Sequence, residues 1–254
     1  MRTFLVILFA LTISYESSGW GQTGHRVVGL IAEYHLSKKA KKNIRNILNG
    51  QSIAMVSNFM DEIKSDDKYD HLYPWHYCTI PDGKTYEEAG TPEEGDIIYA
   101  IELFMDELKS KDFSFEDEAF ALKCLIHLVA DIHQPLHVGN GNDQGGNQVE
   151  VEYFWRKSNL HRVWDTGIID GQNLSYTEYT EWINHPEDQE IENWSKTGIM
   201  DWAYESVSYR EQVYDLTDDH KLSYEYNYKN IDLVNLRLLQ AGIRLAKVLN
   251  DIYG

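Results

Sequence analysis

Histidines and aspartates recur in this chain at spacings that suit a shared metal ion. His127 and Asp131 are four residues apart, and so are His161 and Asp165. On a helix, side chains four residues apart project from one face, within reach of a single ion. Imidazole nitrogen and carboxylate oxygen are ligands of catalytic zinc, which keeps one coordination position open for water or substrate. The two pairs therefore predict a multinuclear zinc site.

Other candidate ligands lie near these pairs in the segments WGQTGH (20–25), PWHYC (74–78) and HLVADIHQPLH (127–137). They divide into two sets, the first formed by Asp61, His76, His127 and Asp131 and the second by His137, His161 and Asp165. The first set comes from three helices or helix ends, so binding an ion there would also tie the fold together.

Trp20 and His25 provide a third possible position for an ion. If the residues before Trp20 are removed, its free α-amino group and backbone carbonyl can form a five-membered chelate, which His25 can join. An α-amino group has a pKa of roughly 7.7 to 8.0, so a metal can displace its proton near neutral pH. Removal of the leader then becomes a condition of activity. The structural alternative is that Trp20 is an aromatic core anchor.

Several of these candidate ligands fall on segments that the sequence predicts to be helical. The apolar periodicity predicts helices at 24–48, 54–65, 93–110, 116–133, 176–184, 187–214 and 230–252. Residues 138–147 read VGNGNDQGGN and predict a loop, and the alternation in QVEVEYF predicts a strand over 148–154 in a short hairpin. No linker or repeat divides residues 20–254, so we expect one mainly α domain with a small β-hairpin.

The first 19 residues have the features of a secretory signal peptide. Arg2 precedes an apolar run over 4–13, and the small residues Ser17 and Gly19 suit cleavage before Trp20. The apolar run is shorter than the roughly 20 residues that a membrane-spanning helix needs. We therefore expect an exported, monomeric protein of residues 20–254 without a membrane partner.

The formal net charge is −18, and it is unchanged by cleavage because Arg2 and Glu16 both leave with the leader. Such a surface has no basic stripe to hold duplex DNA, although zinc ions would supply local positive charge for a phosphate. Only two cysteines occur. An exported protein can form a bridge between Cys78 and Cys124, and two free buried thiols are the alternative.

In combination, the segments WGQTGH, PWHYC, HLVADIHQPLHV, GGN and NLHRVWD resemble the trinuclear-zinc nucleases of fungi, plants and bacteria. That family cleaves single-stranded RNA and DNA, acts on 3′-nucleotides and shares its fold with zinc-dependent phospholipase C. The resemblance covers residues 20–254 and implies a zinc-dependent endonuclease with 3′-nucleotidase activity. Its expected substrates are single-stranded nucleic acid and 3′-nucleotides, and its products carry 5′-phosphates.

The resemblance also implies a set of ligands for each of three Zn²⁺ ions. One ion falls to Asp61, His76, His127 and Asp131; a second to Trp20, His25 and the bridging Asp131; and the third to His137, His161 and Asp165. Two neighbouring zincs would share a hydroxide that attacks the phosphate, while the third would stabilise the departing 3′ oxygen.

Three further residues match positions that contact substrate in this family. Lys64, one helical turn after Asp61, could reach a bound phosphate, and the amide of Asn147 could donate to the transition state. Tyr77 matches an aromatic ring of the nucleobase pocket, where stacking contributes roughly 1 to 3 kcal/mol. The chain departs from the fungal pattern at Thr79, where an aspartate that recognises the base is found. Lys64 as a solvated lysine and Tyr77 as a packing residue are the structural alternatives.

Two other functions compete with the nuclease. A phospholipase C would use the same cluster on a lipid headgroup, but that family generally ends its third site with glutamate rather than with Asp165. A zinc-binding exported protein without turnover would need neither Lys64 nor Asn147.

Overall fold

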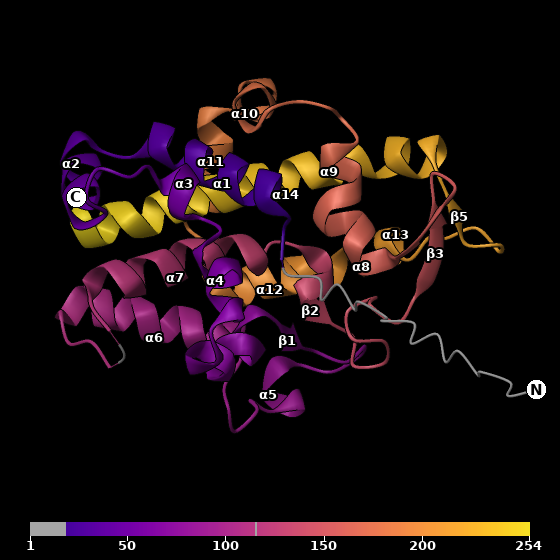
Figure 1. The fold of residues 1–254 in the computed structure, drawn as a ribbon, viewed down its shortest axis with the longest axis horizontal. Coiled ribbons are helices and arrows are strands. Elements are labelled where there is room, and N and C mark those ends of the chain that lie inside the picture. Colours follow the sequence, from indigo (N-terminus) through magenta and orange to yellow (C-terminus); the bar gives the residue numbers. More distant parts are fainter. Residues whose placement is uncertain (1–18, 115) are drawn as a thin grey trace, which may run out of the picture.

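Two helices from opposite ends of the chain, α1 (Gln22–His35) and α14 (Tyr224–Tyr253), pack side by side in the computed structural model (Figure 1). The structure describes residues 19–114 and 116–254. Gly242 allows the two helices to approach closely, because a Cβ at this position would lie 2.4 Å from Cγ2 of Ile31. Residues 1–18 of the predicted leader lie outside the described part of the chain.

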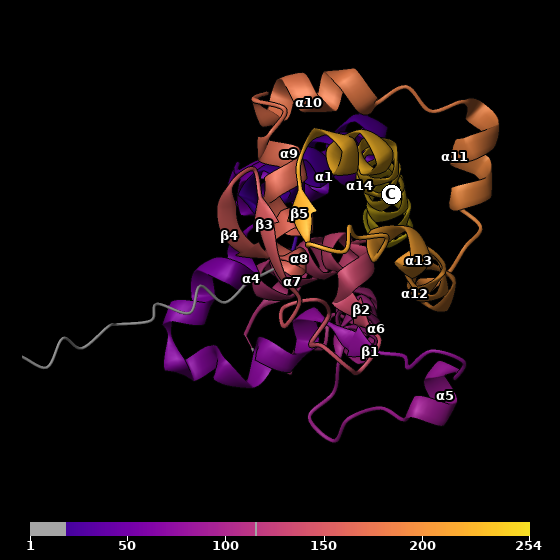
Figure 2. The ribbon, with the colours of Figure 1, turned by 90° about the vertical axis from the view of Figure 1, so that its right-hand side faces the viewer.

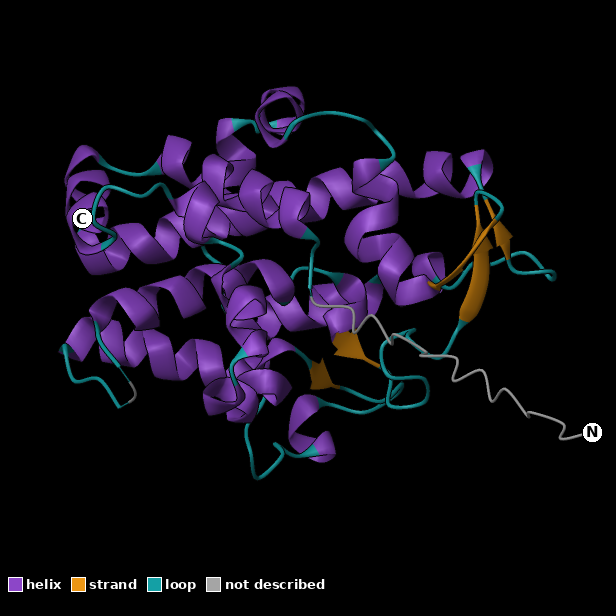
Figure 3. Ribbon diagram, viewed as in Figure 1, coloured by secondary structure: helices purple, strands orange, loops and turns teal. Residues whose placement is uncertain are grey.

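A second helical layer lies beneath this pair and carries α6 (Ile97–Ser110) against α7 (Glu118–Asp131) (Figure 1). The apolar core fills the space between the layers, with Ile31, Phe104 and Leu125 fully buried. The predicted mainly α fold is confirmed (Figure 3). The remaining helices are α2 (Lys38–Ile47), α3 (Ile53–Val56), α4 (Phe59–Glu62), η1 (Ile63–Ser65), η2 (Asp67–His76), α5 (Tyr86–Ala89), η3 (Pro135–His137), α8 (Leu160–Arg162), η4 (Val163–Gly167), α9 (Ile168–Asp170), α10 (Tyr176–Ile183), α11 (Asp188–Trp194), α12 (Ile199–Ser208) and α13 (Arg210–Val213).

The strands are short and form two separate sheets, one of three strands and one of two, and the two-stranded sheet lies below the other in Figure 2. The predicted hairpin is present: β3 (Glu150–Tyr153) pairs antiparallel with β4 (Arg156–Asn159), and β5 (Lys221–Leu222) joins β3 in parallel. A second pair, β1 (Cys78–Thr79) and β2 (Val138–Gly139), is parallel and joins the segments that follow His76 and His137. The sequence analysis did not predict β1, β2 or β5, each of which has only two residues.

Three predicted helices are divided in the structure, and in two of them a polar side chain caps a new helix start. The expected helix over 24–48 breaks at Leu36, which is extended, and Ser37 then caps α2 by accepting from the Ala40 N–H at 3.1 Å. The expected helix over 54–65 is replaced by α3, α4 and η1. The expected helix over 187–214 forms α11, α12 and α13, with a restart at Gly198 whose N–H donates to Asp201 at 2.8 Å. A hydroxyl or carboxylate that bonds free N–H groups makes such a restart favourable.

A buried polar cluster joins α12 and α14 beside the end of α7. Arg237 and Arg244 of α14 both donate to the Glu205 carboxylate of α12, at 2.7 and 2.6 Å. Arg237 also donates through Nε to the backbone oxygen of His133, at 2.9 Å. The turn that leaves α7 is therefore held by α14, which α12 anchors in turn through Glu205.

Cys78 and Cys124 are both buried and free, so the thiol alternative describes this structure rather than the bridge. Burial raises the pKa of both thiols well above the ordinary value. Among the described residues, none of the helices combines the length and the apolar character needed to cross a bilayer.

Candidate metal centre

The last turns of α7 place His127 and Asp131 on one helical face. His127 Nε2 lies 3.1 Å from Asp131 Oδ2, and both side chains are fully buried. Asp131 ends the helix, and its other carboxylate oxygen, Oδ1, lies 3.2 Å from Nε2 of His25 on α1. The two oxygens of one carboxylate thus face two different histidines.

Three groups of side chains in the described residues bring their ligand atoms close enough to hold a metal ion. They are His25 with His127 and Asp131; Asp61 with His76 and His127; and His137 with His161 and Asp165. The ligand atoms of each group lie within 4.8 Å of one another. His127 belongs to two groups, so two of the ion positions adjoin.

Asp61 and His76 approach His127 from α4 and η2. His76 Nδ1 lies 2.9 Å from Asp131 Oδ2 and 3.2 Å from His127 Nε2, and Asp61 Oδ1 lies 3.6 Å from His127 Nε2. The segment η2 is a 3₁₀ helix with Pro74 inside it, and it ends at His76. The chain then becomes extended at Tyr77 and enters β1.

The third group forms where η3 meets the helical turn after β4. His137 and His161 direct their Nε2 atoms at each other, 3.2 Å apart, and His161 Nε2 lies 3.3 Å from Asp165 Oδ2. A π-helical segment, η4, contains Asp165. Single π-helical turns inside helices are frequent at functional sites.

Backbone carbonyls fix three of the imidazole rings from behind. The Nδ1–H groups of His127, His137 and His161 donate to the oxygens of Ser57, His76 and Gly145, at 2.7, 2.6 and 2.6 Å. This assigns the proton to Nδ1 and leaves the Nε2 lone pair facing the centre, which is how proteins orient metal-binding histidines.

These distances agree with the requirements of zinc. With Zn–N and Zn–O bonds of about 2.0 to 2.1 Å, two ligand atoms of a tetrahedral ion lie about 3.3 Å apart. The pair His25 Nε2 and Asp131 Oδ1 fits at 3.2 Å, and so does the pair His161 Nε2 and Asp165 Oδ2 at 3.3 Å. Both nitrogens of His25 and Oδ1 of Asp131 are buried without a hydrogen-bond partner. Buried polar atoms left in this state are costly unless an ion or water satisfies them. The donor set therefore fits zinc.

The electrostatics of the centre favour the protonation states that metal binding needs at His76, His137 and Asp131. Burial lowers the pKa of His76 to about 4 and that of His137 to about 3, so both rings are neutral near pH 7. Burial alone would raise the pKa of Asp131, but the surrounding imidazoles, with His127 the strongest, hold it well below its ordinary value. The carboxylate is therefore ionised beside the neutral rings of His76 and His137, and together with Asp61 it raises the pKa of His127 against the effect of burial.

The GGN segment is held tightly against the third group. Gly145 has φ +61°, and a Cβ there would lie 2.3 Å from the backbone oxygen of Leu136. Only glycine combines this left-handed conformation with so close a contact. The loop thereby presents its carbonyl to His161 and places Asn147, two residues on, at the edge of a pocket.

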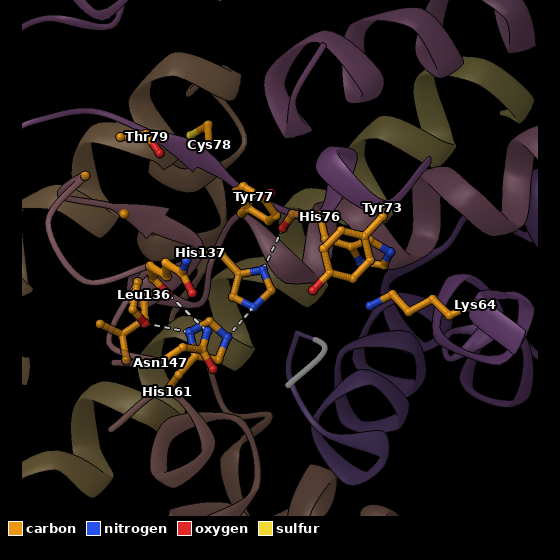
Figure 4. A pocket seen from close by; sticks show the side chains of 14 residues that line it. Lys64, Tyr73, His76, Tyr77, Cys78, Thr79, Leu136, His137, Asn147 and His161 are labelled. Carbon is orange, nitrogen blue, oxygen red and sulfur yellow. Dashed lines mark hydrogen bonds between the residues drawn. The ribbon is translucent and has the colours of Figure 1, made fainter. Parts of the chain in front are cut away.

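That pocket has a volume of about 400 Å³ and opens onto the second and third groups, because His76, His137 and His161 line it. In Figure 4, Lys64 and Tyr73 approach from one side and Asn147 from the other, with His137 between them. Lys64 Nζ lies 3.1 Å from Asp61 Oδ1. The volume of the pocket lies in the range typical of ligand sites.

Aromatic rings form part of the pocket wall. Tyr77 is 43% exposed and Tyr73 is 38% exposed, and their ring centroids are 6.5 Å apart. Lys64 Nζ lies 5.4 Å from the centroid of the Tyr73 ring. Thr79 also lines the pocket, so the departure from the fungal pattern falls on the pocket wall.

Trp20 is fully buried, as the core-anchor alternative requires, and its backbone lies beside the first group. Gly19 just before it has φ +44°, and a Cβ on it would lie 2.0 Å from Asp131 Oδ1 and 2.9 Å from His25 Nε2. The residue that precedes Trp20 thus stands against the two atoms that an ion in the first group would use. Gly21 then bonds to the Asp165 backbone oxygen at 2.7 Å.

The structure adds two residues that the sequence analysis did not select. Gln134 is fully buried and donates to Asp165 Oδ1 at 2.6 Å, and Tyr73 lines the pocket beside Lys64. Tyr73 precedes His76 by three residues in a 3₁₀ helix, where such residues project in the same direction. That spacing could have indicated Tyr73. The contact of Gln134 with a residue 31 positions away had no signal in the sequence.

Comparison with known proteins gives consistent matches over nearly the whole chain. The family model of the S1/P1 nucleases matches residues 20–254. The chain is 29% identical to Endonuclease 2 of Arabidopsis thaliana, over 98% of this chain and 96% of that protein. It is 24% identical to Nuclease P1 of Penicillium citrinum, over 92% of this chain and 98% of that protein. With Nuclease S1 of Aspergillus oryzae it shares 30% identity over 62% of this chain and 57% of that protein.

Proposed function

This chain belongs to the S1/P1 nuclease family, and we propose that it is an exported, zinc-dependent phosphodiesterase that cleaves single-stranded RNA and DNA. Membership of the family makes it a nuclease and therefore a hydrolase. The proposal extends this to 5′-phosphorylated products and to hydrolysis of 3′-nucleotides. The active form would begin at Trp20 after loss of residues 1–19.

One observation carries the proposal: of three His/Asp groups suited to metal ions, the second and third open onto a pocket that has a lysine and an asparagine at its edge, and the first shares His127 with the second. We assign one zinc to Asp61, His76, His127 and Asp131, a second to His25, Asp131 and the amino-terminal group of Trp20, and a third to His137, His161 and Asp165. Zinc ions in these positions would make water a nucleophile near neutral pH and act as Lewis acids on the phosphate.

The side chains around the pocket would bind and orient the scissile phosphate. The Lys64 ammonium and the Asn147 amide face the pocket from opposite sides, so they can donate to different phosphate oxygens (Figure 4). Donors that are aimed in advance at developing charge lower the barrier without reorganising during the reaction. The Asn147 Nδ2 atom donates to the Gln144 backbone oxygen at 3.0 Å, which fixes the direction of its amide.

Tyr77 would select unpaired bases. Its half-exposed ring borders the pocket next to the phosphate-binding side chains, so a base that stacks on it must have left a duplex. The net charge of −18 also disfavours the phosphate-driven binding of long duplex DNA. The substrate of this site would therefore be short or unpaired nucleic acid.

Hydrolysis by zinc-loaded protein that begins at Trp20 tests this proposal. We expect cleavage of single-stranded RNA and DNA with 5′-phosphate ends, release of phosphate from a 3′-mononucleotide, and much slower cleavage of duplex DNA. The 5′-phosphate on the products is detected by digesting them with an exonuclease that requires a 5′-phosphate. Protein with three zincs that hydrolyses none of these substrates would overturn the proposal, and a phosphatidylcholine substrate would then test the phospholipase alternative.

A further inference from the structure

Gln134 contacts three of the residues that we assign to metal binding. Its backbone N–H donates to the Asp131 backbone oxygen at 2.9 Å, and its own backbone oxygen accepts from the His137 N–H at 3.0 Å. Its side chain donates through Nε2 to Asp165 Oδ1 at 2.6 Å. One fully buried residue thus joins the bridging aspartate to two ligands of the third ion.

The orientation of the Gln134 amide is decided by its surroundings. Its Oε1 atom accepts from the Leu136 N–H at 2.5 Å, in the first turn of η3. A backbone N–H can only donate, so the oxygen of the amide must face Leu136 and the NH₂ group must face Asp165. Asp165 Oδ1 therefore receives a hydrogen bond whose direction is set by the backbone.

This bond determines which oxygen of Asp165 faces His161 in the third group. Oδ1 is engaged by Gln134, while Oδ2 lies 3.3 Å from His161 Nε2, a separation that suits two ligands of one zinc. The Oδ1 atom lies farther from the other ring, 4.0 Å from His137 Nε2. Without this bond the Asp165 carboxylate could rotate and present either oxygen to an ion. Gln134 therefore controls the rotation of the carboxylate.

We propose that Gln134 is a positioning residue for the third zinc: it fixes the rotation of the Asp165 carboxylate and joins this site to the bridging Asp131 through the backbone. This inference rests on the proposed function, because it concerns the same zinc centre. Hydrogen-bonding partners of metal ligands typically change metal affinity by about 10- to 100-fold when they are removed. The affinity of one zinc out of three should therefore fall selectively.

The test compares zinc retention in Gln134→Leu and wild-type protein, both beginning at Trp20, during titration with a zinc chelator. We expect Gln134→Leu to lose one zinc at a free zinc concentration about 10- to 100-fold higher than wild type, with the other two retained. Adding zinc should restore its hydrolysis rate, which a general folding defect would not allow. Gln134→Asn keeps the amide but is one methylene shorter, so it should show the same selective loss if the leucine variant fails to fold.

Gln240→Leu is the matched control, because Gln240 is also buried but bonds to Arg237, at 2.7 Å, rather than to an assigned ligand. It should retain all three zincs with wild-type affinity. Retention of three zincs with unchanged affinity in the Gln134 variants, or equal loss of all three, would overturn the inference. Wild-type protein that binds three zincs without hydrolysing nucleic acid would instead overturn the proposed function. The comparison of zinc affinities would still test the role of Gln134 in that case.

Discussion

A single residue retained before Trp20 should strongly weaken binding of the second zinc. It would convert the α-amino group into an amide, which is a poor ligand at neutral pH, and it would occupy the place of Gly19. There a Cβ would lie only 2.0 Å from Asp131 Oδ1 and 2.9 Å from His25 Nε2. The chelating ligand would be lost and the space beside the two remaining ligands would be filled.

The expected loss exceeds the 10- to 100-fold that follows removal of an outer-shell partner, because a direct ligand is removed. We expect zinc affinity at this position, and kcat/KM, to fall by about 100-fold or more, equivalent to about 2.7 kcal/mol of transition-state stabilisation. The larger side chain of an Ala-Trp20 start should cause a greater loss than Gly-Trp20, since the space at Gly19 does not admit a Cβ.

The assay uses chains released from a fusion partner by a protease that leaves no extra residue. Zinc per chain is measured by atomic emission, and initial rates are measured on single-stranded RNA. Chains starting at Trp20, Gly-Trp20 and Ala-Trp20 are compared, and the control carries the extra glycine after Gly254. Three zincs and full activity in the Gly-Trp20 chain would refute the assignment of the amino terminus as a ligand.

Three further perturbations have defined outcomes. Asp131→Asn should lose at least two zincs and all measurable hydrolysis, because its two oxygens face ligands of different ions; unchanged turnover would exclude a bridging role. Lys64→Ala should keep three zincs while kcat falls by about 10²- to 10³-fold, as for other preorganised donors, and a change in KM alone would contradict a role in the transition state. Metal-free protein should lose stability as the pH falls from about 6.5 towards 4, because His76 and His137 resist protonation only when folded. Thermal unfolding across this pH range measures the effect, and a flat profile would show that these rings are not buried in the neutral form.

The helix periodicity of the sequence was sufficient to predict the pairs on single elements. His127 and Asp131 lie on one face of α7 because a helix turns every 3.6 residues, and no tertiary contact is needed to place them together. His161 and Asp165 are similarly close, although part of their helix is π-helical. The position of the short hairpin followed from its alternation and its glycine-rich boundary.

Contacts between residues far apart in the sequence could not be predicted from local periodicity. Gln134 reads as an ordinary polar residue before Pro135, and its role depends on Asp165 arriving from another part of the chain. The helix breaks near Ser37 and Gly198 depend on capping bonds that compete closely with continued helix. The state of Cys78 and Cys124 is decided by where β1 and α7 pack, which composition does not determine.

The most direct test of the zinc centre is anomalous diffraction at the zinc absorption edge from crystals of protein that begins at Trp20. We expect three peaks: one among Asp61, His76, His127 and Asp131, one between His25, Asp131 and the amino group of Trp20, and one among His137, His161 and Asp165. Peaks elsewhere, or a single peak with the remaining groups bonded only to water, would contradict a trinuclear zinc centre.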